Sequence, residues 1–138
     1  MRIVLDTNVL VSGLLSPYGP PAEAVRMVVS ESLTLYVDAR LLVEYRQVLS
    51  RPKFAFDQDR VEALMDLIEA EAIPVMANPL AQRLPDPDDE PFLEVAIAGR
   101  IEALVTGNLV HFPARARAGV TVLGPTDFMA LVRPWSGR

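Results

Sequence analysis

Short, uninterrupted apolar runs alternate along the chain with longer segments in which apolar residues recur every three to four positions. The runs predict strands buried on both faces, and the periodic segments predict amphipathic helices. The clearest helix contains Val61, Leu64, Met65 and Ile68 at i, i+3, i+4 and i+7. We expect strands over 2–5, 33–37, 73–76, 103–106 and 120–123, and helices over 8–15, 22–31, 39–50, 59–71, 90–100 and 126–132.

The alternation of strands and helices indicates how the chain folds. It predicts a parallel sheet with helices on both faces, because a crossover helix must connect each pair of parallel strands. The segment 78–87 carries three prolines and is expected to be a loop. A chain of 138 residues fits one domain. We therefore predict an α/β fold with three layers, α/β/α, around a central sheet of about five strands, with one domain over 1–132 and a flexible tail over 133–138.

The composition limits the kinds of metal site and the cellular location that the protein can have. The chain has no cysteine, which excludes disulfides and thiolate metal sites. No apolar stretch approaches the roughly 20 residues of a membrane span. Asp6 and Asn8 interrupt the apolar N-terminal stretch, which argues against a signal peptide. We expect a cytoplasmic protein without a membrane span.

The charge distribution bears on nucleic-acid binding. The net charge is −5, whereas non-specific nucleic-acid binders are usually basic. Local basic clusters nevertheless exist, and Arg46, Arg51 and Lys53 form a set that could contact a nucleic-acid backbone. The alternative, equally open from sequence, is a solvated helix face.

Two polar residues follow predicted strands directly. Asp6 comes after the run Ile3–Leu5, where burying a carboxylate is costly unless a partner compensates for it. Asn108 comes shortly after the strand over 103–106. Since binding sites in open parallel sheets lie at the carboxyl ends of the strands, both residues are expected at the same edge of the sheet.

Glu44 belongs to the helix predicted over 39–50. It lies beside the apolar stripe of Leu41, Tyr45 and Val48, so it is expected to point toward the sheet edge. The alternative is a surface glutamate whose aliphatic stem covers apolar side chains.

The stretch DPDDEPFLEVAIAG, residues 86–99, places several acids at the start of a helix. Asp89 lies one turn before Phe92 on the apolar stripe, whereas Glu90 falls on the opposite side. An aspartate before Pro91 is also a natural helix cap. A cap explains one acid, but it does not explain why four of them crowd one helix end.

If Asp6, Glu44 and Asp89 converge, they repel one another. Two carboxylates about 4 Å apart cost roughly 4 kcal/mol at an effective dielectric constant near 20. A divalent cation removes this cost, and oxygen ligands without cysteine favour Mg²⁺ or Mn²⁺ over Zn²⁺. Such an ion polarises phosphate and activates water, so the acids indicate a phosphoryl-transfer or phosphodiester-cleaving site.

Four segments carry the candidate residues and their neighbours: DTNVLVSGLL with Asp6, LLVEYRQVLSRPKF with Glu44, DPDDEPFLEVAIAG with Asp89, and LVTGNLVHFP. Together they resemble the PIN domain family of Mg²⁺- or Mn²⁺-dependent ribonucleases, and within it the VapC-type toxins of toxin–antitoxin systems. The segments cover nearly the whole chain in the order found in the family.

The resemblance implies roles for individual residues. Asp6, Glu44 and Asp89 would hold the metal, and a metal-bound water would attack a phosphate of the RNA substrate. Asn8 and Thr106 would orient the ligands or the water. The resemblance also implies a five-stranded parallel sheet, a homodimer and an antitoxin protein as partner.

Asn108 departs from the family pattern, in which a fourth acid is common at this place. Its carbonyl oxygen can ligate a metal but brings no charge, which makes it a weaker ligand. Asp88 is a further weak candidate because it lies beside Asp89. A second hypothesis is therefore a non-catalytic PIN-like module that binds RNA or protein.

Two further features of the sequence bear on the class of protein. His111 lies three residues after Asn108 and could contact phosphate or transfer a proton, although a single loop histidine more often makes local hydrogen bonds. An aspartyl-phosphate phosphatase or receiver-like domain would need a lysine late in the chain. The chain's one lysine, Lys53, lies in the middle, which argues against that class.

Overall fold

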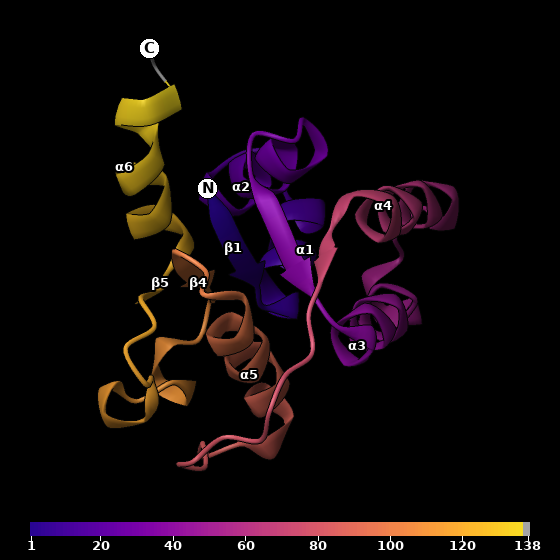
Figure 1. Ribbon diagram of the computed structural model, residues 1–138. Helices are drawn as coiled ribbons and strands as arrows, with labels where there is room; N and C mark the ends of the chain where they lie inside the picture. The colour runs from indigo at the N-terminus through magenta and orange to yellow at the C-terminus, as the bar shows by residue number, and fades with distance from the viewer. Residues whose placement is uncertain (137–138) are drawn as a thin grey trace.

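The computed structural model describes residues 1–136, and none of the helices in this part of the chain is long and apolar enough to cross a membrane. The elements alternate as the sequence predicts (Figure 1). Their bounds are β1 (Arg2–Leu5), α1 (Thr7–Leu15), α2 (Pro20–Val29), β2 (Thr34–Val37), α3 (Ala39–Leu49), α4 (Gln58–Glu71), β3 (Ile73–Pro74), α5 (Glu90–Gly99), β4 (Ala103–Val105), β5 (Val122–Leu123) and α6 (Pro125–Ser136). Short 3₁₀ helices are η1 (Pro52–Phe54), η2 (Pro87–Asp89), η3 (Leu109–His111) and η4 (Ala114–Ala116).

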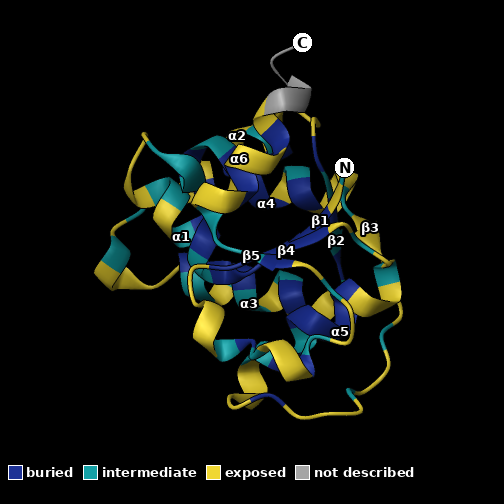
Figure 2. Ribbon diagram, turned by 90° about the vertical axis from the view of Figure 1, so that its left-hand side faces the viewer, coloured by how far each residue is buried: buried dark blue, intermediate teal, exposed yellow. Residues whose placement is uncertain are grey.

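The described strands form one parallel sheet in the order β3-β2-β1-β4-β5. The central strands β1 and β4 are aligned so that Leu5 lies opposite Val105. Figure 2 shows the buried strands between α2 and α6 on one side and α5 on the other. The expectation of a three-layer α/β/α fold with about five parallel strands is confirmed.

The core follows from the apolar runs and stripes of the sequence. Every residue of β4 is fully buried, as are Ile3, Val4 and Leu5 of β1. On α3 the buried stripe consists of Leu41, Tyr45 and Leu49. The hydroxyl of Tyr45 donates a 2.6 Å hydrogen bond to the carbonyl of Leu5, which ties α3 to the end of the central strand.

Several element ends differ from the sequence prediction, and among them the last strand begins at Val122 and not at 120. The strand expected over 73–76 stops at Pro74, although the N–H of Val75 still donates to the carbonyl of Val37 at 3.0 Å. The second helix starts at Pro20, two residues early, because proline suits the first helical turn. The last helix runs to Ser136 and not to Val132, so most of the tail expected over 133–138 is helical. Residues 137–138 lie outside the described residues.

The proline-rich segment between β3 and α5 is held by two glutamates of α5. Glu90 accepts hydrogen bonds from the backbone N–H of Leu84 (2.9 Å) and from the side chain of Arg83 (3.0 Å). The backbone bond lowers the pKa of Glu90. Glu94 accepts from the backbone N–H of Leu80 at 3.2 Å. These contacts fix the loop that leads into the N-terminus of α5.

Candidate active site

The candidate site lies where the strand order changes direction. The chain builds β1, β2 and β3 toward one side of the sheet and then returns to place β4 on the other side of β1. Ligands of open α/β sheets bind at the carboxyl ends of the strands at such a switch point. Asp6 lies at the end of β1, and its N–H donates to the carbonyl of Val105, at the end of β4, at 2.9 Å.

Asp6 is buried at this edge, with 5% of its surface exposed. Its Oδ2 accepts a 2.8 Å hydrogen bond from Thr106 Oγ1 and a 3.2 Å bond from Asn8 Nδ2. Asn8 is held in turn by the N–H of Gly107, which donates to Asn8 Oδ1 at 2.8 Å. Burial raises the pKa of Asp6, and the hydrogen bond from Thr106 is the largest effect that opposes the rise.

Glu44 reaches the same edge from the middle of α3. Asp38 fixes the start of this helix, because its carboxylate accepts from the backbone N–H groups of Arg40 and Leu41. The Glu44 carboxylate is half-buried and accepts a hydrogen bond from the hydroxyl of Thr7. Burial raises the pKa of Glu44, and the charge of Asp6 raises it further. This environment differs from that of a freely solvated surface glutamate.

Asp89 ends η2, directly before α5. Its side chain makes no capping hydrogen bond in the described structure, so capping does not explain it. Its Oδ2 is buried and receives no aligned hydrogen bond from the described residues, although His111 Nδ1 lies 3.0 Å away. Burial raises the pKa of Asp89 to about 6, the charge of Asp6 adds to the rise, and His111 opposes it.

These three carboxylates share one weakly solvated region. The charge of Asp6 raises the pKa of both Glu44 and Asp89, which requires all three to lie within electrostatic range. Within the described residues, no three His, Asp or Glu side chains are arranged closely enough to hold a metal ion as they stand. The donor set still suits a hard cation, since carboxylate oxygens are the ligands that such a cation prefers and their negative charges repel one another in its absence.

The two weaker ligand candidates lie at the rim of this region. Asn108 is exposed, and its backbone N–H donates to Thr106 Oγ1 at 3.0 Å. Asp88 is also exposed, and its charge contributes to the raised pKa of Glu44. Asp86 also lies close enough for its charge to raise the pKa of Asp89, and its side chain accepts from the backbone N–H of Asp88 and stabilises η2.

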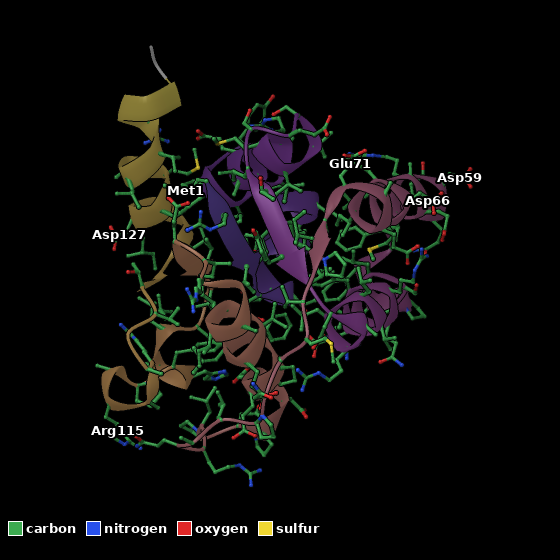
Figure 3. The ribbon with its side chains drawn as sticks, in the orientation of Figure 1. Met1, Asp59, Asp66, Glu71, Arg115 and Asp127 are labelled. Carbon is green, nitrogen blue, oxygen red and sulfur yellow. The ribbon has the colours of Figure 1, made fainter. Side chains whose placement is uncertain are left out.

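The structure separates the three basic residues singled out from sequence. The Arg46 guanidinium pairs with α4, where it lies 2.8 Å from Glu62, 2.9 Å from Glu69 and 3.7 Å from Asp66. Figure 3 shows Asp66 on the outer part of α4. Arg51 is exposed, and its charge opposes the rise in the pKa of Glu44, so it lies near the acids. The remaining residue, Lys53, is exposed and sits 5.1 Å from the centre of the Phe54 ring.

Two contacts of the site were not predicted from sequence. Thr7 donates a hydrogen bond to Glu44, which lies 37 positions away in the sequence. The sequence suggests a phosphate contact or local hydrogen bonds for His111, whereas its imidazole lies against Asp89. Both contacts join segments that are distant in sequence, and helical or strand periodicity does not detect such pairs.

Comparison with known proteins identifies the family. Residues 2–110 match the PIN domain model, so the chain belongs to the PIN domain family. PIN domains are generally nucleases, which places the candidate site in a class of hydrolases. The uncharacterized protein MJ1680 of Methanocaldococcus jannaschii is 23% identical over 111 residues, spanning 78% of this chain and 71% of that protein.

Two solved structures share the fold. A chain of VapBC2 from Rickettsia felis, in a structure bound to a DNA fragment from its promoter, matches with a TM-score of 0.57 and 14% identity. A chain of FitAcB from Neisseria gonorrhoeae matches with a TM-score of 0.60 and 21% identity. Each match covers 90% of this chain and 98% of the other. At these identities the likeness concerns the fold.

Proposed function

We propose that the protein is an endoribonuclease that hydrolyses RNA phosphodiester bonds with Mg²⁺ or Mn²⁺. One observation carries the proposal: Asp6 lies at the switch point of a PIN-domain sheet within electrostatic range of Glu44 and Asp89, and the pKa of each of the three is raised. Burial and mutual repulsion disfavour the charged form of these carboxylates. A bound divalent cation would stabilise that charged form.

Each residue then has a defined task. The carboxylates of Asp6, Glu44 and Asp89 would hold the cation, which when bound supplies charge neutralisation at phosphate and a more acidic water. Thr106 and Asn8 would keep one oxygen of Asp6 in place through the hydrogen bonds that they donate. Burial of Asp6 strengthens the electrostatic interactions of its carboxylate.

The rim residues complete the proposal. Asn108 and Asp88 would act as weaker ligands, of which only Asp88 brings charge. Arg51, whose charge acts on Glu44, and Lys53 are exposed cations that would contact an RNA backbone. For Arg46 such a role competes with its ion pairs to α4. Occupancy of Mn²⁺ sites in Asp88→Asn, counted by anomalous scattering, tests Asp88, and unchanged occupancy would remove it from the ligand set.

The biological setting proposed is that of a toxin. The chain resembles VapC-type toxins and shares its fold with a chain of the VapBC2 structure. We propose a cytoplasmic homodimer that is inhibited by a cognate antitoxin. Expression of the chain alone should arrest bacterial growth, and co-expression of a small DNA-binding protein encoded beside it should restore growth. Growth arrest by Asp6→Asn to the same degree would contradict a toxicity that depends on cleavage.

Cleavage of labelled single-stranded RNA tests the enzymatic function. Wild type should cleave with Mn²⁺ or Mg²⁺ and stop when a chelator is added, whereas Asp6→Asn should lose at least about a hundredfold in rate, as expected for removal of a metal ligand. Asp127→Asn is a matched control, because Asp127 is an exposed acid on α6, on the side of the molecule away from α4 (Figure 3). Equal rates in wild type and Asp6→Asn would overturn the proposal.

Two observations favour a second candidate function. An uncharged residue, Asn108, stands where many PIN domains have an acid, and the chain is acidic overall. A non-catalytic module would bind RNA or a protein without turnover even in excess Mn²⁺. RNA binding by wild type without any cleavage across a series of Mn²⁺ concentrations would favour this candidate.

A further inference from the structure

The segment after β4 contacts the candidate site at three successive points. Thr106 donates to Asp6, Gly107 donates to Asn8, and His111 lies against Asp89. The first two contacts reach the end of β1, while the third reaches the N-terminus of α5. A six-residue stretch of chain therefore bridges the two elements that carry Asp6 and Asp89.

The position of His111 within this stretch is fixed from both sides. Its backbone N–H donates to the carbonyl of Asn108 at 3.0 Å, which closes the turn of η3. The next residue, Phe112, is fully buried, and its carbonyl accepts a 2.7 Å hydrogen bond from the Nε of Arg117. The backbone thus has little freedom to carry the imidazole away from Asp89.

The contact with Asp89 is specific at the atomic level. His111 Nδ1 lies 3.0 Å from Oδ2, the oxygen that is buried without an aligned hydrogen bond from the described residues. The Asp89 side chain is 14% exposed and that of His111 is 40% exposed. The imidazole therefore covers a carboxylate oxygen on one side and remains accessible on the other.

We propose that His111 is a positioning residue of the carboxylate site, which holds Asp89 Oδ2 through its Nδ1 and so orients Asp89 toward Asp6 and Glu44. This inference rests on the proposed function, because it assumes that these acids bind a divalent cation. It assigns His111 no proton transfer and no contact with RNA. Groups that fix the orientation of a metal-binding carboxylate typically change metal affinity by 10- to 100-fold when removed.

Four proteins test the inference through Mn²⁺ affinity, measured by calorimetry without RNA: wild type, His111→Ala, His111→Asn and His111→Gln. The side-chain nitrogen of asparagine takes the place of Nδ1, whereas that of glutamine takes the place of Nε2. We expect His111→Ala to weaken Mn²⁺ binding by about tenfold or more. His111→Asn should restore affinity to within about threefold of wild type, and His111→Gln should not.

A second measurement covers the case in which a variant folds poorly. His111 is the only histidine of the chain, so its imidazole signals in nuclear magnetic resonance are unambiguous. Addition of Mg²⁺ to wild type should shift these signals with the midpoint of Mg²⁺ binding. In Asp89→Asn the shift should be lost.

The outcomes separate the two levels of the proposal. No Mn²⁺ binding by wild type would contradict the proposed metal-dependent function. Wild-type affinity in His111→Ala, or imidazole signals that stay unchanged while wild type binds Mg²⁺, would contradict the role of His111 alone. Equal losses of Mn²⁺ affinity in His111→Asn and His111→Ala would show that a nitrogen at the position of Nδ1 does not support Mn²⁺ binding. This result would also overturn the inference.

Discussion

Thr106 Oγ1 donates a 2.8 Å hydrogen bond to Asp6 Oδ2, joining the ends of two adjacent strands whose residues lie 100 positions apart. The same oxygen of Asp6 also accepts from Asn8. Thr106 itself accepts from the backbone N–H of Asn108. A single hydroxyl thus connects the carboxylate of β1 to the loop after β4, and it does so where the strand order changes direction.

Thr106→Val tests this connection, because valine keeps the shape of the side chain and removes the donor. Losing a hydrogen bond to a buried carboxylate should cost about 1–3 kcal/mol of the free energy of unfolding. Metal affinity and RNA cleavage should each fall by about tenfold. Denaturant unfolding and Mn²⁺ titration measure the two effects. Thr121→Val, at an exposed site, is the control, and equal behaviour of the two variants would show that the hydroxyl of Thr106 is not required.

The raised pKa of Asp89 predicts how the stability of the metal-free protein varies with pH. The pKa rises from 3.8 to about 6 on folding, so between these values the folded state holds more protons than the unfolded state. The free energy of unfolding should therefore fall as the pH rises through about 6. Asp6 and Glu44, whose pKa values are also raised, act in the same direction.

Asp89→Asn removes the largest part of this effect. We expect the variant to be more stable than wild type by about 1–2 kcal/mol near pH 8 in chelator, with a smaller difference near pH 5. Added Mg²⁺ should stabilise wild type near pH 8 and have little effect on the variant. Urea unfolding at both pH values measures this. A wild-type protein that gains stability from about pH 5 to pH 8 in chelator would contradict the assigned environment of Asp89.

Much of the fold follows from local patterns in the sequence. The apolar runs of β1 and β4 predict buried strands, and the rule for the carboxyl ends of parallel strands places Asp6 at the correct edge of the sheet. Helical periodicity places Glu44 beside the buried stripe that includes Leu41 and Tyr45. Apolar runs and helical periodicity extend over several residues, so a single exceptional residue does not change the prediction.

The contacts that depend on tertiary packing could not be predicted in the same way. Glu90 does fall on a different side of α5 from the apolar stripe, but it is buried because the proline-rich loop folds back to donate to it. The pairing of His111 with Asp89 depends on a turn and on the burial of Phe112. Such positions are set by where a loop returns to the domain, which periodicity does not encode.

Both Arg46 and Arg51 are candidates for RNA binding from sequence, but we expect Arg46 to contribute to stability and Arg51 to contribute to RNA affinity. Arg46→Gln removes ion pairs to α4 and should lower the free energy of unfolding by about 1 kcal/mol with little effect on RNA affinity. Arg51→Gln should change stability by less than about 0.5 kcal/mol and weaken RNA binding, with a salt dependence shallower by about one unit. Fluorescence anisotropy with labelled RNA in an Asp6→Asn background measures binding without cleavage. Weaker RNA binding by Arg46→Gln together with unchanged RNA binding by Arg51→Gln would contradict these roles.

Gly13 permits the close packing of α1 on α2. A Cβ atom at this position would lie 2.7 Å from Val25 Cγ2 and 2.9 Å from the carbonyl oxygen of Pro21. Gly13→Ala should therefore destabilise the protein by about 1–3 kcal/mol, although alanine favours a helix by about 1 kcal/mol relative to glycine. Thermal unfolding measures the change. Ser12→Ala, at an exposed position of the same helix, should be neutral or slightly stabilising, and a stabilised Gly13→Ala would contradict the packing.

The central claim is that the acids at the carboxyl edge of the sheet bind a divalent cation, and its location can be measured directly. Crystals of wild type soaked in Mn²⁺ should show an anomalous peak within about 2.5 Å of carboxylate oxygens of Asp6 and Asp89, with Glu44 on the same ion directly or through water. The peak should be absent in Asp6→Asn. A wild-type crystal without a peak at this edge, at a Mn²⁺ concentration that supports RNA cleavage in solution, would contradict the account.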